Sequence, residues 1–154
     1  MKSDLFSWPI PGYTYISSYY GKRKSPTVGA STFHSGIDIP APEGTPLYAI
    51  EYGEITFCSW GAGGGYTVVL TLIDYPGISV SYCHMSPSFN VKLHQIVDRD
   101  YNIGYVGPKN VYGINNNPYK DSDGNPTNGA TTGTHLHFSI KIDGKTTDPL
   151  DYYH

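Results

Sequence analysis

Two histidines separated by one residue give the sequence its strongest chemical signal. His135 and His137 stand in the run THLHFSIKID, whose alternation of polar and apolar residues is typical of a β-strand. Side chains two apart on a strand point to the same face, so both imidazoles should lie on one side, with Leu136 and Phe138 toward the core. Such a rigid pair can share a metal ion, or one ring can bind the metal while the other moves protons.

Three further residues extend this set. His34 and Asp38 are four apart in the glycine-containing segment FHSGIDIP, where even spacing lets both side chains reach one side of an extended chain. His84 lies in a third β-like run, ISVSYCHMS, and shares the parity of Tyr82. Each piece alone has a plainer interpretation, such as a loop histidine or a carboxylate that stabilises a turn. Together they indicate a metal site.

Zinc suits these residue types. Catalytic zinc usually takes three protein ligands from His and Asp or Glu and leaves the fourth position to water, whose pKa it lowers to about 7. Cobalt or copper could occupy the same ligand types. The remaining histidines titrate near neutral pH and can serve as acid and base. The HExxH motif, whose Glu can act as general base beside two zinc-binding histidines, is absent, so a histidine would have to be the general base.

The elements that would position these residues are short strands joined by turns. Gly, Pro and Tyr are abundant, and no long amphipathic helix or internal repeat is present. Strand-like runs include PLYAI, EITFCSW, YTVVLTLID, ISVSYCHMS, NIGYVG and THLHFSIKID. The sequence therefore predicts one all-β domain over residues 1–154, mainly antiparallel.

Weaker segments fill the rest of the chain. We expect residues 1–12 to be an N-terminal arm laid over the domain, 16–20 a short strand, and the last residues a single helical turn. Residues 108–133 are rich in Gly, Asn, Pro, Asp and Thr, which predicts a long loop insertion, and such loops tend to be functional. The parity of the run around Cys83 turns its thiol away from the face of Tyr82 and His84. We therefore expect a buried free cysteine, although a disulfide with Cys58 is possible.

Composition excludes several classes of function. The net charge is only −3 and no basic block occurs, so a nucleic-acid partner is not expected. No apolar run has the length of a membrane span, and the start MKSDLFSWPIPG lacks the apolar segment of a signal peptide. The chain could act in the cytosol, in a virion, or outside the cell after removal of a signal.

The motifs also carry a resemblance. SYYGKRKSP, FHSGIDIPAPEGTPLYAIEYGEI, GGGYTVVL, YCHMS, GYVG, GTHLHFSI and DPLDYY follow one another in this order. This order resembles the lysostaphin-type zinc endopeptidases, which cleave peptide cross-links of bacterial peptidoglycan. The resemblance runs from about Ser17 to Tyr153. It implies the family's fold, a twisted, mainly antiparallel sheet of the duplicated hybrid motif type, which forms a groove with zinc at its floor.

The resemblance also implies roles for individual residues. One zinc ion would be held by His34, Asp38 and His137. His135 would be the general base, and His84 a second catalytic residue that donates a hydrogen bond to the oxyanion.

Other positions agree less closely with the family pattern. Arg23 matches an arginine near the site edge, where it would contact substrate carboxylates or remain a solvated surface residue. Met85 replaces the usual Leu, and the long loop at 108–133 exceeds the family's usual length. That loop bears on substrate preference and not on the metal site.

These expectations define a zinc metalloendopeptidase that hydrolyses peptide bonds in the stem or cross-bridge of peptidoglycan. The alternative is a non-catalytic wall-binding or regulatory module of the same fold, against which the intact His84 and His135 argue. A structural zinc protein would need four ligands. We expect a monomer that binds a peptidoglycan peptide outside the cell, in the cell wall or on a phage virion. The cleaved bond could be glycyl-glycine or a D-amino-acid cross-link.

Overall fold

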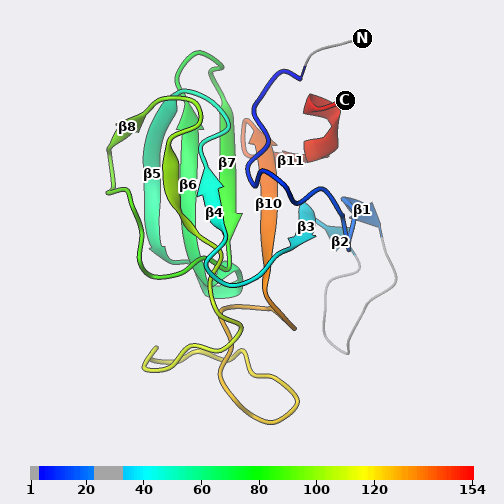
Figure 1. Ribbon diagram of the computed structural model, residues 1–154, viewed down its shortest axis with the longest axis vertical. Helices are drawn as coiled ribbons and strands as arrows, with labels where there is room; N and C mark the ends of the chain where they lie inside the picture. Colours follow the sequence, from blue (N-terminus) through cyan, green and yellow to red (C-terminus); the bar gives the residue numbers. More distant parts are fainter. Residues whose placement is uncertain (1–3, 23–32) are drawn as a thin grey trace.

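The computed structural model describes residues 4–22 and 33–154 (Figure 1). At its centre is a seven-stranded sheet in which every paired strand runs antiparallel to its neighbour. Within the described ranges there is no α-helix, so the predicted all-β fold is confirmed. The order across the sheet is β11 (Lys145–Thr147), β10 (His135–Ile142), β7 (Ile78–Cys83), β6 (Tyr66–Leu72), β5 (Gly53–Trp60) and β8 (Ile96–Val97), with β3 (Ile37–Pro40) also paired to β10.

Smaller elements surround the sheet. Two-stranded sheets join β1 (Gly21–Lys22) to β2 (Phe33–His34) and β4 (Pro46–Tyr48) to β9 (Asn102–Tyr105). Short 3-10 helices occur at η1 (Ala62–Gly64) and η2 (Pro149–Tyr152). The strand expected at residues 16–20 is not formed, because Ser18 makes only an isolated bridge to Asp38.

The helical turn expected near the end of the chain is η2. The Asp148 side chain caps it by accepting a hydrogen bond from the backbone N–H of Leu150. Pro149 follows at a position where its missing N–H costs nothing. No helix in the described part of the chain has the length and apolar character to cross a membrane.

Alternation along β10 divides the sheet into two faces. Leu136, Phe138 and Ile140 are fully buried and belong to the core. Tyr82 of β7 lies on the same side, with its ring edge-on to Phe138. The alternate residues of β10, which include His135 and His137, therefore face the opposite side of the sheet.

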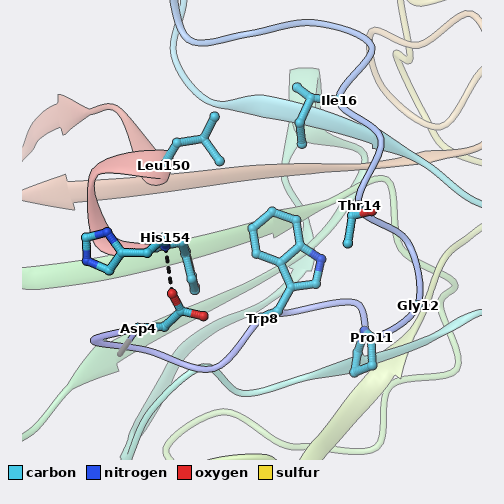
Figure 2. Close-up of a pocket in the computed structure, with 9 residues that line it drawn as sticks. Asp4, Trp8, Pro11, Gly12, Thr14, Ile16, Leu150 and His154 are labelled. Carbon is cyan, nitrogen blue, oxygen red and sulfur yellow. Dashed lines mark hydrogen bonds between the residues drawn. The ribbon is translucent and has the colours of Figure 1, made fainter. Parts of the chain in front are cut away.

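The N-terminal arm contributes to the core. Phe6 and Ile10 are fully buried, and the Phe6 ring stacks on Tyr152 with 5.4 Å between centroids. Asp4 accepts a hydrogen bond from the backbone N–H of His154, with 2.6 Å between the two atoms (Figure 2). The two ends of the described chain are therefore joined on one side of the molecule (Figure 1).

A mainly apolar hollow of about 480 Å³ lies between this arm and the C-terminal residues (Figure 2). Trp8 forms part of its wall and donates its indole N–H to the carbonyl of Tyr13. None of the described residues that line this hollow belongs to a cluster of metal-ligating side chains. The cluster of metal-ligating side chains lies elsewhere, at the start of β10.

Candidate metal centre

Strand pairing brings three metal-ligating side chains together. β3 pairs with β10 so that Asp38 lies opposite His137. His34 ends β2, two residues before Gly36. Glycine is required at position 36 for this segment to lie so close to β10, because a Cβ there would be 2.3 Å from the carbonyl oxygen of Phe138.

The three donor atoms match the coordination sphere of zinc. His34 Nε2 lies 3.2 Å from Asp38 Oδ1 and 3.1 Å from His137 Nδ1, and the last two atoms are 2.9 Å apart. A tetrahedral zinc with bonds of 2.0–2.1 Å has ligand atoms roughly 3.3 Å apart. Within residues 4–22 and 33–154, this is the one group of three such side chains with donor atoms inside 4.8 Å of one another.

The hydrogen bonding of His34 points its lone pair at this centre. Its Nδ1 lies 3.1 Å from the carbonyl oxygen of Tyr19, which can only accept, so Nδ1 carries the proton in the neutral ring. Nε2 is then an acceptor that faces the acceptor Asp38 Oδ1. Two acceptors at this distance need a proton or a metal cation between them, and a second bond that fixes the tautomer is typical of metal-binding histidines.

The carboxyl group of Asp38 is held in its charged form. Burial acts to raise its pKa, but the imidazoles of His135, His137 and His34, when protonated on the nitrogen that faces Asp38, outweigh burial and hold the pKa well below its ordinary value of 3.8. A hard anionic oxygen beside two imidazoles is a donor set that suits zinc.

His135 lies beside the cluster without joining it. Its Nδ1 lies 3.2 Å from the carbonyl oxygen of Gly133 and 3.3 Å from Thr131 Oγ1. Because the carbonyl can only accept, Nδ1 carries the proton and Nε2 keeps its lone pair. That Nε2 is 3.5 Å from Asp38 Oδ1, so it faces the metal centre.

His84 reaches the site by leaving the strand pattern. The parity argument was wrong here: Tyr82 points into the core, where its hydroxyl donates to the carbonyl of Tyr48, and Cys83 faces the groove beside His137. The backbone of His84 takes a left-handed conformation, with φ of 59°, which breaks the alternation. Its ring centroid consequently lies 4.8 Å from that of His135.

The environment of His84 keeps its ring neutral. Burial and, to a smaller extent, the neighbouring His135 together lower its pKa from 6.5 to about 3, against a weaker opposite effect from the carbonyl of Asn128. That carbonyl lies 2.6 Å from His84 Nδ1, which must therefore be the N–H donor. Nε2 of the neutral ring is an acceptor, like Nε2 of His135.

These five residues lie in a groove of about 1660 Å³. The floor is the face of β10 and β7 opposite the core, and the long loop forms one wall through Tyr119, Thr131 and neighbouring residues. This loop lies beyond the end of the sheet at which β10 begins (Figure 1). Arg23, expected near the site edge, lies outside the described residues.

The sequence profile of Peptidase family M23 matches residues 32–149, which contain all five of these residues. The chain belongs to Peptidase family M23. The M23 chain is 32% identical over 138 residues to the DD-carboxypeptidase/endopeptidase Mpg of Neisseria meningitidis, covering 90% of this chain and 27% of that protein. It therefore spans about a quarter of the length of this relative.

Solved structures agree with this assignment. The catalytic domain of lysostaphin from Staphylococcus simulans is 26% identical, with a TM-score of 0.70 and 91% of each chain covered. A zinc-containing peptidase from Vibrio cholerae, 21% identical, has the same fold with a TM-score of 0.71, covering 96% of this chain and 39% of that one. The predicted family and the lysostaphin-type fold are confirmed.

Both cysteines of the M23 domain are free thiols, so the possible Cys58–Cys83 disulfide is not formed. Burial raises the pKa of Cys83 to about 11. The thiol therefore stays protonated at neutral pH, and Cys83 is not one of the three residues of the metal-ligating cluster, although it pairs with His137.

One residue that supports the site was missed in the sequence. Asn128, in the long loop, is fully buried, and its side chain donates to the carbonyls of Met85 and Pro108 at 3.0 and 3.2 Å. Its Oδ1 accepts from the backbone N–H of Tyr66, while its own carbonyl accepts from His84. Asn128 thus joins the loop, β6 and the segment after β7. Nothing in the sequence distinguished Asn128 from the other asparagines of this loop, so its supporting role could not be predicted.

Proposed function

We propose that this M23 domain is a zinc endopeptidase that hydrolyses peptide bonds in bacterial peptidoglycan. The observation that carries the proposal is the convergence of two kinds of group in one groove. His34, Asp38 and His137 form a three-ligand centre, and His135 and His84 stand beside it with their Nε2 lone pairs available. A structural metal site would be closed by a fourth ligand.

We further propose that the cleaved bond joins two D-amino acids in a cross-link. The sequence left this bond and a glycyl-glycine bond open. The names of two relatives favour the D-amino-acid cross-link: Mpg is a DD-carboxypeptidase/endopeptidase, and ShyB of Vibrio cholerae, 26% identical over 140 residues, is a peptidoglycan DD-endopeptidase.

The geometry supports His135 as the general base. When bound, zinc would polarise the substrate carbonyl and provide a water of pKa about 7. The Nε2 of His135 is an acceptor in the groove, since Gly133 fixes the other nitrogen as the donor. It would take the proton of the attacking water and pass it to the leaving amine. His84 is the poorer base because burial, together with the neighbouring His135, lowers its pKa to about 3.

The tautomer of His84 limits how this residue can assist the reaction. A neutral ring that donates Nδ1–H to Asn128 offers only an acceptor at Nε2. The proposed donation to the oxyanion therefore requires that His84 binds a second proton from the solvent, distinct from the proton that His135 passes to the leaving amine. Removing a donor to a developing oxyanion costs on the order of a hundredfold in kcat.

The test uses the zinc-loaded chain with purified walls and soluble cross-linked dimers of defined chemistry. We expect mass spectrometry to show dimers resolved into monomers at the D,D bond, with loss of cleavage on chelation and recovery with zinc. If the chain binds walls but releases no fragment, it is the non-catalytic module. If it cleaves glycyl-glycine bridges instead, the bond assignment is wrong.

We also propose that the domain acts at the cell envelope as a monomer. Peptidoglycan is part of the cell envelope, and membership of the M23 family is the reason to infer peptidoglycan as the substrate. Light scattering on the purified chain tests the monomer; a dimer mass at assay concentrations would contradict it.

A further inference from the structure

The floor of the groove continues along β10 beyond the metal ligands. Ser139 and Lys141 follow His135 and His137 on the same face, because residues two apart share a face of a strand. On β7, Cys83 pairs with His137, Ser81 with Ser139, and Ser79 with Lys141. The floor therefore carries small polar side chains at Ser81 and Ser139, and Lys141 follows them along the same face of β10.

Lys141 has a charge without an acidic partner. Its side chain is half-buried and lines the groove, yet no acid of the described ranges forms an ion pair with it. Lys109, on the loop side of the groove, differs because its ammonium lies 3.3 Å from Asp121 Oδ2. A partly desolvated ammonium in a groove is a strong site for an anion, since no internal carboxylate competes for it.

A wall encloses this end of the groove. Thr146 of β11 pairs with Lys141, and the hydroxyl of Tyr20 donates to the Thr146 carbonyl at 3.1 Å. Tyr20 also lines the groove and packs edge-on against Phe33. Lys141 therefore lies beside a fixed aromatic side chain and not on an open surface.

The charges of the groove favour an anionic ligand. Among the described residues that line it, the lysines are Lys22, Lys109, Lys120 and Lys141, whereas the acids are Asp38 and Asp121. Asp38 belongs to the metal centre and Asp121 is paired with Lys109. With a divalent cation bound at Asp38, the groove carries a positive excess.

We propose that Lys141 forms a subsite that binds a carboxylate of the substrate peptide, away from the bond that is cut. This inference rests on the proposed function, whose substrate peptides carry free carboxylates. Lys141 lies four positions after His137 on the strand, or roughly 14 Å away at about 3.4 Å per residue. An extended peptide spans about 3.3–3.6 Å per residue, so with the reach of the lysine side chain the carboxylate lies about two to four residues from the scissile bond.

The test compares two cross-linked peptides that differ only in whether this carboxylate is free or amidated. We expect the wild-type chain to prefer the free acid, with a KM about tenfold lower, which corresponds to about 1.4 kcal/mol. Lys141→Gln should lose that preference with little change in kcat, and Lys141→Arg should keep most of it. Lys145→Gln is the matched control, because Lys145 is exposed on β11 and does not line the groove.

Binding separates this inference from the proposed function. Calorimetry with the same two peptides measures affinity whether or not the peptides are cleaved. A wild-type preference for the free acid that Lys141→Gln abolishes supports the subsite even if no hydrolysis occurs. Equal affinity for the two peptides, or a preference that survives Lys141→Gln, overturns it.

Discussion

Replacing Gly36 by alanine tests how the metal centre is assembled. The new methyl group would lie 2.3 Å from the carbonyl oxygen of Phe138, whereas ordinary contacts begin near 3.4 Å. The obstacle is backbone on β10, so β3 and β10 must move apart by about 1 Å. Overpacking of this kind costs roughly 1–3 kcal/mol of unfolding free energy. For a chain of this size, that lowers the Tm by roughly 2–12 °C.

The same movement should weaken zinc binding. Asp38 Oδ1 and His137 Nδ1 are 2.9 Å apart across these two strands, and separation by about 1 Å takes them beyond the roughly 3.3 Å of a tetrahedral edge. Metal sites tolerate deviations of only about 0.2 Å in their bonds. We expect zinc affinity to fall about 10–100-fold, the range seen when the support of a ligand is removed.

The assay is thermal unfolding with and without zinc, together with competition for zinc against a chelator of known affinity. Gly133→Ala is the matched control, because nothing lies within 4 Å of a Cβ at that position. It should change the unfolding free energy by no more than about 1 kcal/mol and leave zinc affinity intact. If Gly36→Ala behaves like this control, the close approach of β3 to β10 does not hold the metal centre together.

Three other changes probe separate residues. His135→Ala should keep zinc, measured by metal analysis, but lose cleavage about a hundredfold or more, whereas His34→Ala should lose both; full activity of the first variant would refute the base assignment. The aspartate of Asn128→Asp cannot donate to the carbonyls of Met85 and Pro108, so the unfolding free energy should fall by about 1–3 kcal/mol. We also expect a lower kcat at unchanged zinc affinity, and nitrogen NMR can follow the tautomer of His84. The unfolding free energy of the zinc-free protein should decrease as the pH falls from 6.5 toward 3. In this range His84 is protonated in the unfolded chain but stays neutral in the folded one, where its pKa is about 3. The slope is at most about 1.4 kcal/mol per pH unit, and His84→Asn, which suits the left-handed backbone, should reduce it; an unchanged slope in denaturant titrations would exclude His84 as the cause.

The parts of the site that were predictable from sequence depend on local pattern. The strand that carries His135 and His137 was predicted correctly, because alternation of buried and exposed residues is encoded within a few positions. The meeting of Asp38 with His137 joins residues 99 apart, and spacing alone does not encode such a pairing. It was the resemblance to a family that supplied the ligand set.

The errors have physical causes of their own. Alternation fails at His84 because a single left-handed residue redirects its side chain, and no neighbouring glycine marked that break. Phe6 and Ile10 lie in a proline-rich arm without periodicity, so their burial in the core depends on distant partners such as Tyr152. Asn128 acts through hydrogen bonds to three separate segments, which only the folded chain brings together.

The bond between Asp4 and His154 has a consequence for how the domain can be used. Both ends leave from one side, whereas the long loop lies beyond the other end of the sheet (Figure 1). Domains with adjoining ends tolerate circular permutation and insertion into host proteins. In a variant that begins at Asp4, a short tether from His154 to Asp4 would close the polypeptide into a ring, and a carrier attached there would leave the groove open to a substrate as large as a cell-wall network.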